Sequence, residues 1–154
     1  MGFSWVGLVI AVIMILPSIV FSKYFPPIDA IEIIDTNKVY TILERVGQIG
    51  CLTSLIISKE FFLLSNSNVW FYLMIIGIII YLMLWIRYVI KGREIKYTLM
   101  PFLGIPIPLA VIPVCIFEFA SLWGNCIWLG IFGIIFAIGH LRITWNTYVQ
   151  VFKK

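Results

Sequence analysis

The sequence has few charged residues for its length. Charged side chains make up 12% of the 154 residues, against about 25% in an average soluble domain, and 62% of the residues are hydrophobic. So few charges cannot keep so much apolar surface in water, and the composition therefore indicates a membrane protein. The net charge of +4 does not indicate nucleic-acid binding, because the basic residues form short clusters at the ends of apolar segments.

Cysteine and histidine are too sparse for metal or haem chemistry. Cys51, Cys115 and Cys126 form no CxxC pair, and His140 is the only histidine. One such chain cannot supply a zinc site or a haem held by two histidines. We therefore expect no metal site and no cofactor, with the cysteines acting as small apolar residues within helices.

The N-terminal segment lacks the features of a cleaved signal peptide. Residues 1–22 carry no charged side chain, so the basic n-region is missing, and no small-residue cleavage site ends the segment. We expect this segment to be retained as a first membrane span.

Long apolar segments predict an all-α fold, a polytopic bundle in which one domain, residues 1–154, crosses the lipid bilayer five times. Each helical span requires about 20 apolar residues. The predicted spans are residues 3–22, 41–64, 69–90, 98–120 and 124–141. Residues 142–154 form an amphipathic tail, which we expect to continue the last helix.

The second span has two possible boundaries. Residues 39–58 form an apolar segment between two lysines. Thr41 and Glu44 also match the S/T-x-x-E capping box, which would begin the helix at about Ile42 and extend it to Leu64. We adopt the boundaries that the capping box gives.

The fourth span contains four prolines. Each of Pro101, Pro106, Pro108 and Pro113 removes a backbone donor, and carbonyl groups freed within a bilayer need partners in protein or water. We therefore expect a helix broken by prolines that faces protein or a cavity.

Acidic and isoleucine side chains repeat at intervals of three between the first two spans. They predict a short amphipathic helix on the membrane surface over residues 28–35. We expect its acidic face to be solvated rather than to hold a cation.

The positions of lysine and arginine predict the orientation. Five spans place the termini on opposite sides of the membrane. With the N-terminus outside, Lys59 alone of the 11 basic residues lies outside. We expect a multi-pass protein of a bacterial-type plasma membrane with a cytoplasmic C-terminus.

Ionisable groups at membrane depth are the candidate functional residues, because burying them costs a few kcal/mol or more. Glu44 shares a helix face with Gln48, and His140 follows a face of small residues along the last span. We expect both to point into the bundle and to form a network with one or two of the arginines at a similar depth, which are Arg45, Arg87 and Arg142. The alternative is a structural role, in which Glu44 neutralises an arginine and His140 bonds a carbonyl group.

Glu118 is the third candidate. It shares a helix face with Pro101 and Pro108, so its carboxylate lies on the side where the helix is broken. Two half-helices that meet between Pro106 and Pro113 would expose carbonyl groups to an ion or a polar ligand group. The alternative is that Glu118 reaches water at the outer interface.

These residues support a first hypothesis of binding. The protein would hold or transport a small amphipathic molecule or ion in a cavity formed by Glu44, Glu118, His140 and the prolines of the fourth span. In a second hypothesis the protein is an enzyme acting on a lipid or prenyl substrate at the inner leaflet. His140 would then be the general base, Glu44 would orient it, and an arginine would bind an anionic headgroup. The absence of a nucleophile, metal set or cofactor loop counts against this enzyme.

A third hypothesis is a non-catalytic subunit or immunity-type partner. Gly130, Gly133 and Ala137 form a face that would let a second helix approach closely, in a homo- or hetero-oligomer.

Overall fold

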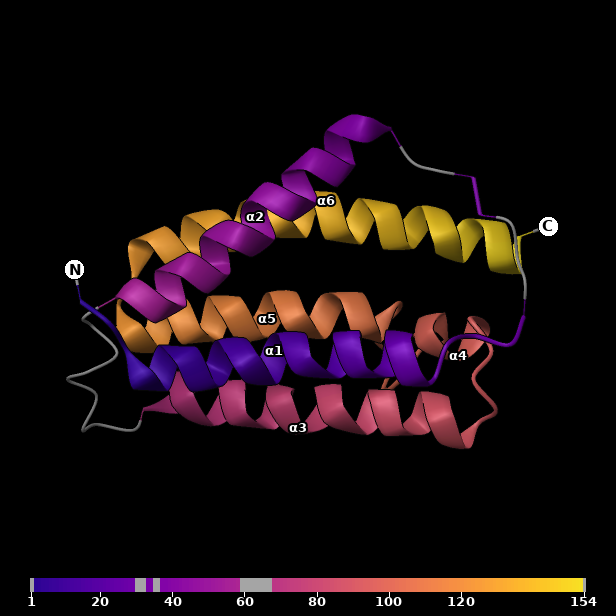
Figure 1. The fold of residues 1–154 in the computed structure, drawn as a ribbon, viewed down its shortest axis with the longest axis horizontal. Helices are drawn as coiled ribbons and strands as arrows, with labels where there is room; N and C mark the ends of the chain where they lie inside the picture. Colours follow the sequence, from indigo (N-terminus) through magenta and orange to yellow (C-terminus); the bar gives the residue numbers. More distant parts are fainter. Residues whose placement is uncertain (1, 30–32, 35–36, 59–67, 154) are drawn as a thin grey trace.

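The computed structural model describes residues 2–29, 33–34, 37–58 and 68–153. Its helices are α1 (Trp5–Tyr24), α2 (Lys38–Ile57), α3 (Val69–Ile90), α4 (Lys96–Leu99), α5 (Pro108–Gly124) and α6 (Ile127–Phe152). These residues contain no strand beyond one isolated bridge, so the described part of the chain is a helical bundle. The N- and C-termini lie at opposite ends of the bundle (Figure 1).

Three of the described helices are long and apolar enough to cross a membrane. They are α1, α3 and α6, whereas α5 is apolar but has only 17 residues. Large apolar side chains are exposed on α3, among them Ile76, Ile79 and Ile86. Lipid can cover such a surface without the free-energy cost that water imposes. The structure therefore indicates a membrane protein.

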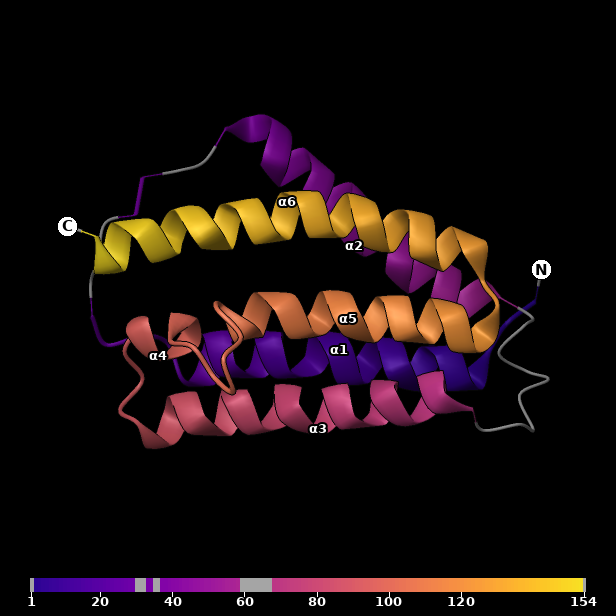
Figure 2. The same cartoon turned by 180° about the vertical axis from the view of Figure 1, so that it is seen from behind.

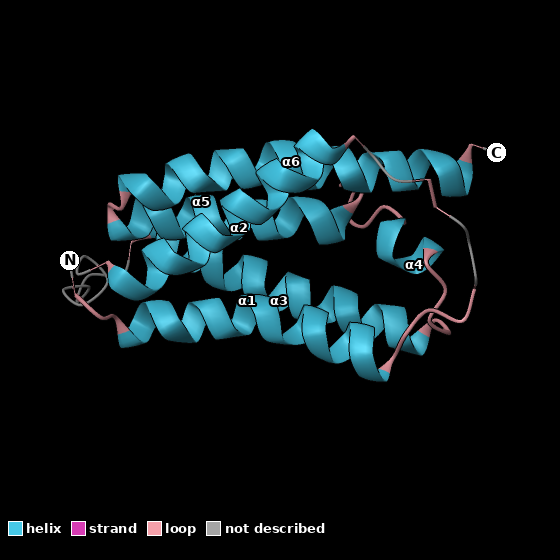
Figure 3. Ribbon diagram, turned by 45° about the horizontal axis from the view of Figure 1, so that its top comes forward, coloured by secondary structure: helices cyan, strands magenta, loops and turns pink. Residues whose placement is uncertain are grey.

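The helices pack around α5. It lies between α3 and α6 (Figures 1 and 2) and contacts both. α2 packs mainly on α6 and crosses it obliquely (Figure 3). Only the C-terminal end of α2 is bonded to the start of α1, where the backbone N–H groups of Gly2 and Ser4 donate to the carbonyl groups of Ile57 and Ile56. The N-terminal half of α2 therefore diverges from α1.

Side-chain caps explain where α1 and α3 begin. The Ser4 hydroxyl accepts a hydrogen bond from the Gly7 N–H at 3.0 Å, and the Asn68 side chain accepts from the N–H groups of Trp70 and Phe71. α3 coincides with the helix expected at residues 69–90, and α1 lies two residues beyond the helix expected at residues 3–22.

The predicted capping box of the second helix is wrong. α2 begins at Lys38, before Thr41, because the Asn37 side chain accepts from the Val39 N–H at 3.0 Å and so caps an earlier turn. The helix ends at Ile57, and Ser58 is extended. The structure thus follows the alternative boundaries, residues 39–58. The predicted extension to Leu64 lies outside the described residues.

The fourth helix is begun by a proline rather than broken by several. α5 starts at Pro108, whose missing N–H costs nothing in the first turn of a helix. Pro101 and Pro106 lie in the turn before it, where Phe102 and Ile105 exchange backbone hydrogen bonds of 2.9 and 3.1 Å. That turn also includes three residues with positive φ, at positions 103, 104 and 107. Pro113 alone lies inside the helix, and the short helix α4 was not expected.

The C-terminal tail continues the last helix, as expected. α6 has 26 residues and is about 39 Å long. Its last turns bring Leu141, Tyr148 and Val151 against a small buried cluster that includes Leu99 and Ile107. The tail thus packs on α4 and the start of α5.

The connection between α1 and α2 does not form the predicted surface helix in its described residues, 25–29 and 33–34. Asp29 instead accepts a hydrogen bond from the Ile95 N–H, at 2.9 and 3.1 Å to its two oxygens. The Gln150 side chain binds the backbone N–H and carbonyl group of Ile34, at 2.8 and 3.0 Å. These bonds to distant segments compete with a local helix. The remaining positions lie outside the described residues.

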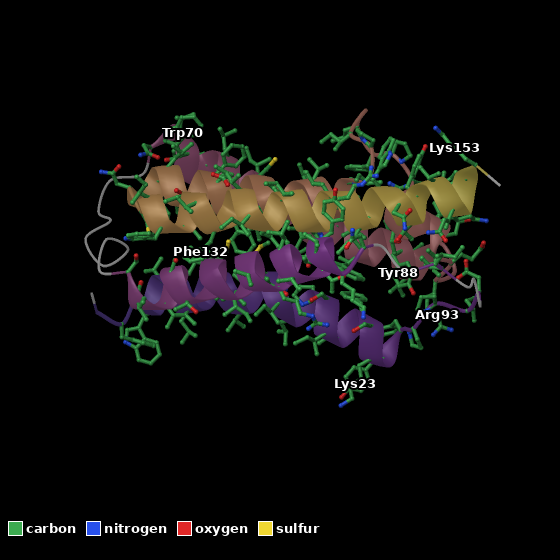
Figure 4. The ribbon with its side chains drawn as sticks, turned by 90° about the horizontal axis from the view of Figure 1, so that it is seen from above. Lys23, Trp70, Tyr88, Arg93, Phe132 and Lys153 are labelled. Carbon is green, nitrogen blue, oxygen red and sulfur yellow. The ribbon has the colours of Figure 1, made fainter. Side chains whose placement is uncertain are left out.

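Two glycines allow α2 and α6 to approach closely. A Cβ atom at Gly139 would collide with the backbone of Tyr40 and Glu44, and one at Gly47 would collide with the backbone of Phe136. Further along the crossing, Phe132 lies between α6 and α2 (Figure 4), against Gly50.

This crossing generates a stability prediction. Gly139→Ala should lower the free energy of unfolding by about 1–3 kcal/mol, because the clashing atoms belong to a helix backbone that cannot rotate away. Thermal unfolding of the purified protein in detergent measures the effect. Gly130→Ala on the same helix is the control and should cost less, since its Cβ would meet side-chain atoms of Ser121 and Glu118 rather than backbone. Equal stability of the two variants would contradict the crossing.

Candidate functional site

Glu44 and His140 form a pair between α2 and α6. The Nδ1 atom of His140 lies 2.5 Å from Oε1 of Glu44, and the two side chains are 23% and 25% exposed. Phe136, one turn earlier on α6, stacks on the imidazole with ring centroids 4.6 Å apart. When Glu44 is ionised, Nδ1–H of a neutral imidazole donates to it, and Nε2 is left as an acceptor.

The pair faces a cavity of about 120 Å³ inside the bundle. Five helices contribute to its lining, namely α1, α2, α3, α5 and α6. Its polar lining residues are Ser18, Glu44, Gln48, Tyr81, Trp85 and His140, and Phe117 and Phe136 add aromatic walls. Gln48 both lines the cavity and is exposed, so the cavity opens beside it, where α2 diverges from α1.

Both hydroxyl groups in this lining already have partners. The Tyr81 hydroxyl donates to the Met14 carbonyl group at 3.2 Å, and the Ser18 hydroxyl donates to the Ile15 carbonyl group at 2.8 Å. The indole Nε1 of Trp85 is buried and has no hydrogen-bond partner among the described residues. The indole does, however, interact with the neighbouring Tyr81 phenol. The polar atoms that the cavity offers to a ligand are therefore chiefly those of Glu44 and His140.

An apolar groove lies next to the cavity. It has a volume of about 320 Å³ and lies between α1 and α2. Its lining residues are all apolar: Leu8, Ala11, Val12, Ile15, Leu16, Ile19, Leu52 and Ile56. Ile15 and Leu52 line both the groove and the cavity, so the two spaces adjoin.

The structure does not bring the predicted arginines to the pair. The Arg87 guanidinium lies over the Phe102 ring at 5.5 Å, and that of Arg142 lies over the Tyr40 ring at 5.9 Å. The ring quadrupoles attract the guanidinium groups, which explains these positions. Neither arginine lines the cavity of Glu44 and His140, so the anionic-headgroup clamp that the enzyme hypothesis requires is not formed there.

Glu118 is separated from the pair. Its carboxyl group lies against Gly133 of α6, and Oε1 is buried without a hydrogen-bond partner among the described residues. It lines a different space, an apolar groove of about 620 Å³ between α5 and α6 that also includes Ala137 and Arg142. The single cavity expected from the sequence is thus divided in two.

The prolines do not gather around one cavity either. Pro113 lines the cavity of Glu44 and His140, whereas Pro106 lines the groove of Glu118. Pro108 is buried at the start of α5 and lines neither space. The expected common face assumed that all four prolines lie in one helix. The helix begins only at Pro108, so the spacing of helix faces does not apply to Pro101 and Pro106 before it.

The small-residue face of α6 is covered in part by α5. A Cβ atom at Gly130 would meet Ser121, and one at Gly133 would meet Glu118. These two glycines therefore serve packing within the chain. Association with a partner through this face stays a prediction.

Three of the polar lining residues were not expected from the sequence: Ser18, Tyr81 and Trp85. A usable signal was present, because each is a polar or amphipathic side chain inside an otherwise apolar span. Tyr81 and Trp85 are also four residues apart and so share one face of α3. Ile15 and Leu52 carry no such signal.

No protein-family model, curated protein or solved structure matches this chain.

The geometry predicts that Glu44 and His140 are coupled energetically. In a double-mutant cycle with Glu44→Gln and His140→Ala, the coupling should be about 1 kcal/mol, as for hydrogen-bonded pairs between membrane helices. Unfolding free energies in detergent provide the measurement. Glu118→Gln combined with His140→Ala is the control, and its effects should add to within about 0.5 kcal/mol because Glu118 lines another groove. Additive effects in both cycles would show that the pair is not formed.

Proposed function

We propose that the protein is a five-pass protein of a bacterial-type plasma membrane that binds and transports a small amphipathic molecule or ion between its helices. The observation that carries the proposal is that Ile15 and Leu52 line two neighbouring spaces. One is the cavity of Glu44 and His140, called the chamber from here on, and the other is the wholly apolar groove between α1 and α2. A polar head in the chamber and a hydrocarbon tail in the groove would match this division.

Helix lengths and directions support five passes. α2 and α5 have 20 and 17 residues, which correspond to about 30 and 26 Å, close to the thickness of a hydrocarbon core. The five long helices alternate in direction along the bundle (Figure 1). Lys23, Arg93 and Lys153 lie toward one end and Trp70 toward the other (Figure 4). The positive-inside rule assigns the basic end to the cytoplasm.

This orientation predicts which sites a membrane-impermeant maleimide can label. A cysteine replacing Phe3 should react in intact cells, because Phe3 is exposed at the outer end. A cysteine replacing Lys91 should react only after permeabilisation. The unsubstituted protein provides the background, since Cys51 and Cys126 are buried and Cys115 is half-buried. The opposite labelling pattern would reverse the topology.

The arrangement suits an amphiphile of the inner leaflet. Ser18 and Glu44 lie in the cytoplasmic halves of their helices, and the groove runs from this region along α1 to Leu8. The distance from Ile19 to Leu8 along the helix is about 16 Å. A tail bound there would extend toward the membrane centre, as lipid tails of that leaflet do.

Binding is tested by ligand-dependent thermal stability in phosphatidylcholine nanodiscs. At least one of dodecylamine, dodecanol and dodecanoic acid should raise the unfolding midpoint. At a hundredfold excess of ligand over the dissociation constant, the free energy of unfolding should increase by about 2.7 kcal/mol. Ile19→Trp should reduce this stabilisation, because the indole would fill the groove.

Ile79→Trp is the matched control. Ile79 lies on α3 and is 52% exposed, against 54% for Ile19, but it lines neither the groove nor the cavity. It should leave the stabilisation unchanged. If none of the three compounds stabilises the protein, the proposed function is wrong.

A further inference from the structure

The chamber beside Glu44 and His140 has a chemical bias that narrows the ligand class, an inference that rests on the proposed function. Among the described residues, the ionisable groups that line it are those of Glu44, His140 and Tyr81. The described lining includes no lysine and no arginine. With His140 neutral, an anionic head would therefore meet the Glu44 carboxylate without a compensating lysine or arginine. Two like charges in contact repel each other strongly in a medium of low dielectric constant.

The free hydrogen-bonding atoms of the chamber are mostly acceptors. The hydrogen bond between the pair uses Oε1 of Glu44, so the second carboxylate oxygen is not engaged by His140. In the neutral tautomer whose Nδ1–H donates to Glu44, Nε2 of His140 is an acceptor. The Tyr81 hydroxyl uses its proton on Met14 and can still accept. A primary ammonium group has three donors and no acceptor, so it complements this set.

The aromatic walls favour the same kind of head. Tyr81, Trp85, Phe117 and Phe136 line the chamber, and aromatic faces attract cations most strongly where water is excluded. The Trp85 indole itself interacts with the Tyr81 phenol and is not left for the ligand. A hydroxyl group next to the ammonium group would instead add one more donor for the acceptors of the chamber.

We infer that the ligand is a long-chain primary amine, best an amino alcohol, with its ammonium group on Glu44 and its hydrocarbon chain in the groove between α1 and α2. Carboxylate and phosphate amphiphiles are disfavoured by the same lining. The inferred ligand is therefore a cation. The enzyme hypothesis, in which an arginine binds an anionic headgroup, expects an anion instead.

Binding of four probes with equal chains tests this inference: dodecylamine, 2-aminododecan-1-ol, dodecanol and dodecanoic acid. Zwitterionic phosphatidylcholine nanodiscs are used, so that the membrane surface does not concentrate cations. The two amines should bind about tenfold more tightly than dodecanol, with the amino alcohol at least equal to dodecylamine, and dodecanoic acid should bind most weakly. Equal or tighter binding of dodecanol or dodecanoic acid overturns the inference, and weaker binding of the amino alcohol removes the role given to the ligand hydroxyl group.

Two variants locate the ammonium group. Glu44→Gln should weaken binding of dodecylamine about tenfold and leave that of dodecanol unchanged, because it removes the charge but keeps the shape. Glu118→Gln removes a carboxyl group that lines the other groove and should leave both affinities unchanged. Loss of amine binding in Glu118→Gln, or its persistence in Glu44→Gln, overturns the assignment. Binding of all four probes without preference refutes the amine inference alone, whereas binding of none refutes the proposed function as well.

Discussion

The backbone contact between α2 and α6 is the constraint on which the rest of the structure depends. Gly139 and Gly47 leave no side chain between the two helices, and Glu44 lies at this contact. His140 follows Gly139 directly, so the same approach brings the imidazole to the carboxylate. Hydrogen bonds between the termini of α1 and α2 fix the other end of α2. With both contacts fixed, the course of α2 across the bundle is determined.

This course explains why a polar space exists inside an apolar bundle. α2 is bonded to α1 only near its C-terminal end, and towards Lys38 it follows α6 instead (Figure 3). The widening space receives polar side chains from helices that are otherwise apolar, such as Ser18 and Tyr81. Glu44 and His140 satisfy one hydrogen bond of each other, which offsets part of the cost of burial. The proposed binding rests on the polar atoms of this space that the pair does not use.

The sequence predicted features that depend on one helix and missed those that depend on how helices are rotated or joined. The bounds of α3 follow from an unbroken apolar segment and the Asn68 cap, and helix faces were enough to orient Glu44 and His140 inward. The start of α5 was missed because the turn before Pro108 relies on three positive φ angles that no periodicity reveals. The partner of an arginine was missed as well, since carboxylates and aromatic rings compete for guanidinium groups and their positions are set by packing.

The distribution of charge connects orientation in the membrane with ligand choice. Lysine and arginine gather at one end of the bundle, where long side chains reach the interface and aromatic rings hold the guanidinium groups of Arg87 and Arg142. Glu44 lies in the second turn of α2 and lines the cavity, where its ion-pair partner is His140 and the described lining includes no lysine or arginine. The cavity is therefore acidic although the protein as a whole carries a net charge of +4. The same separation of charges leaves a carboxylate facing aromatic walls, the arrangement from which we infer a cationic ligand.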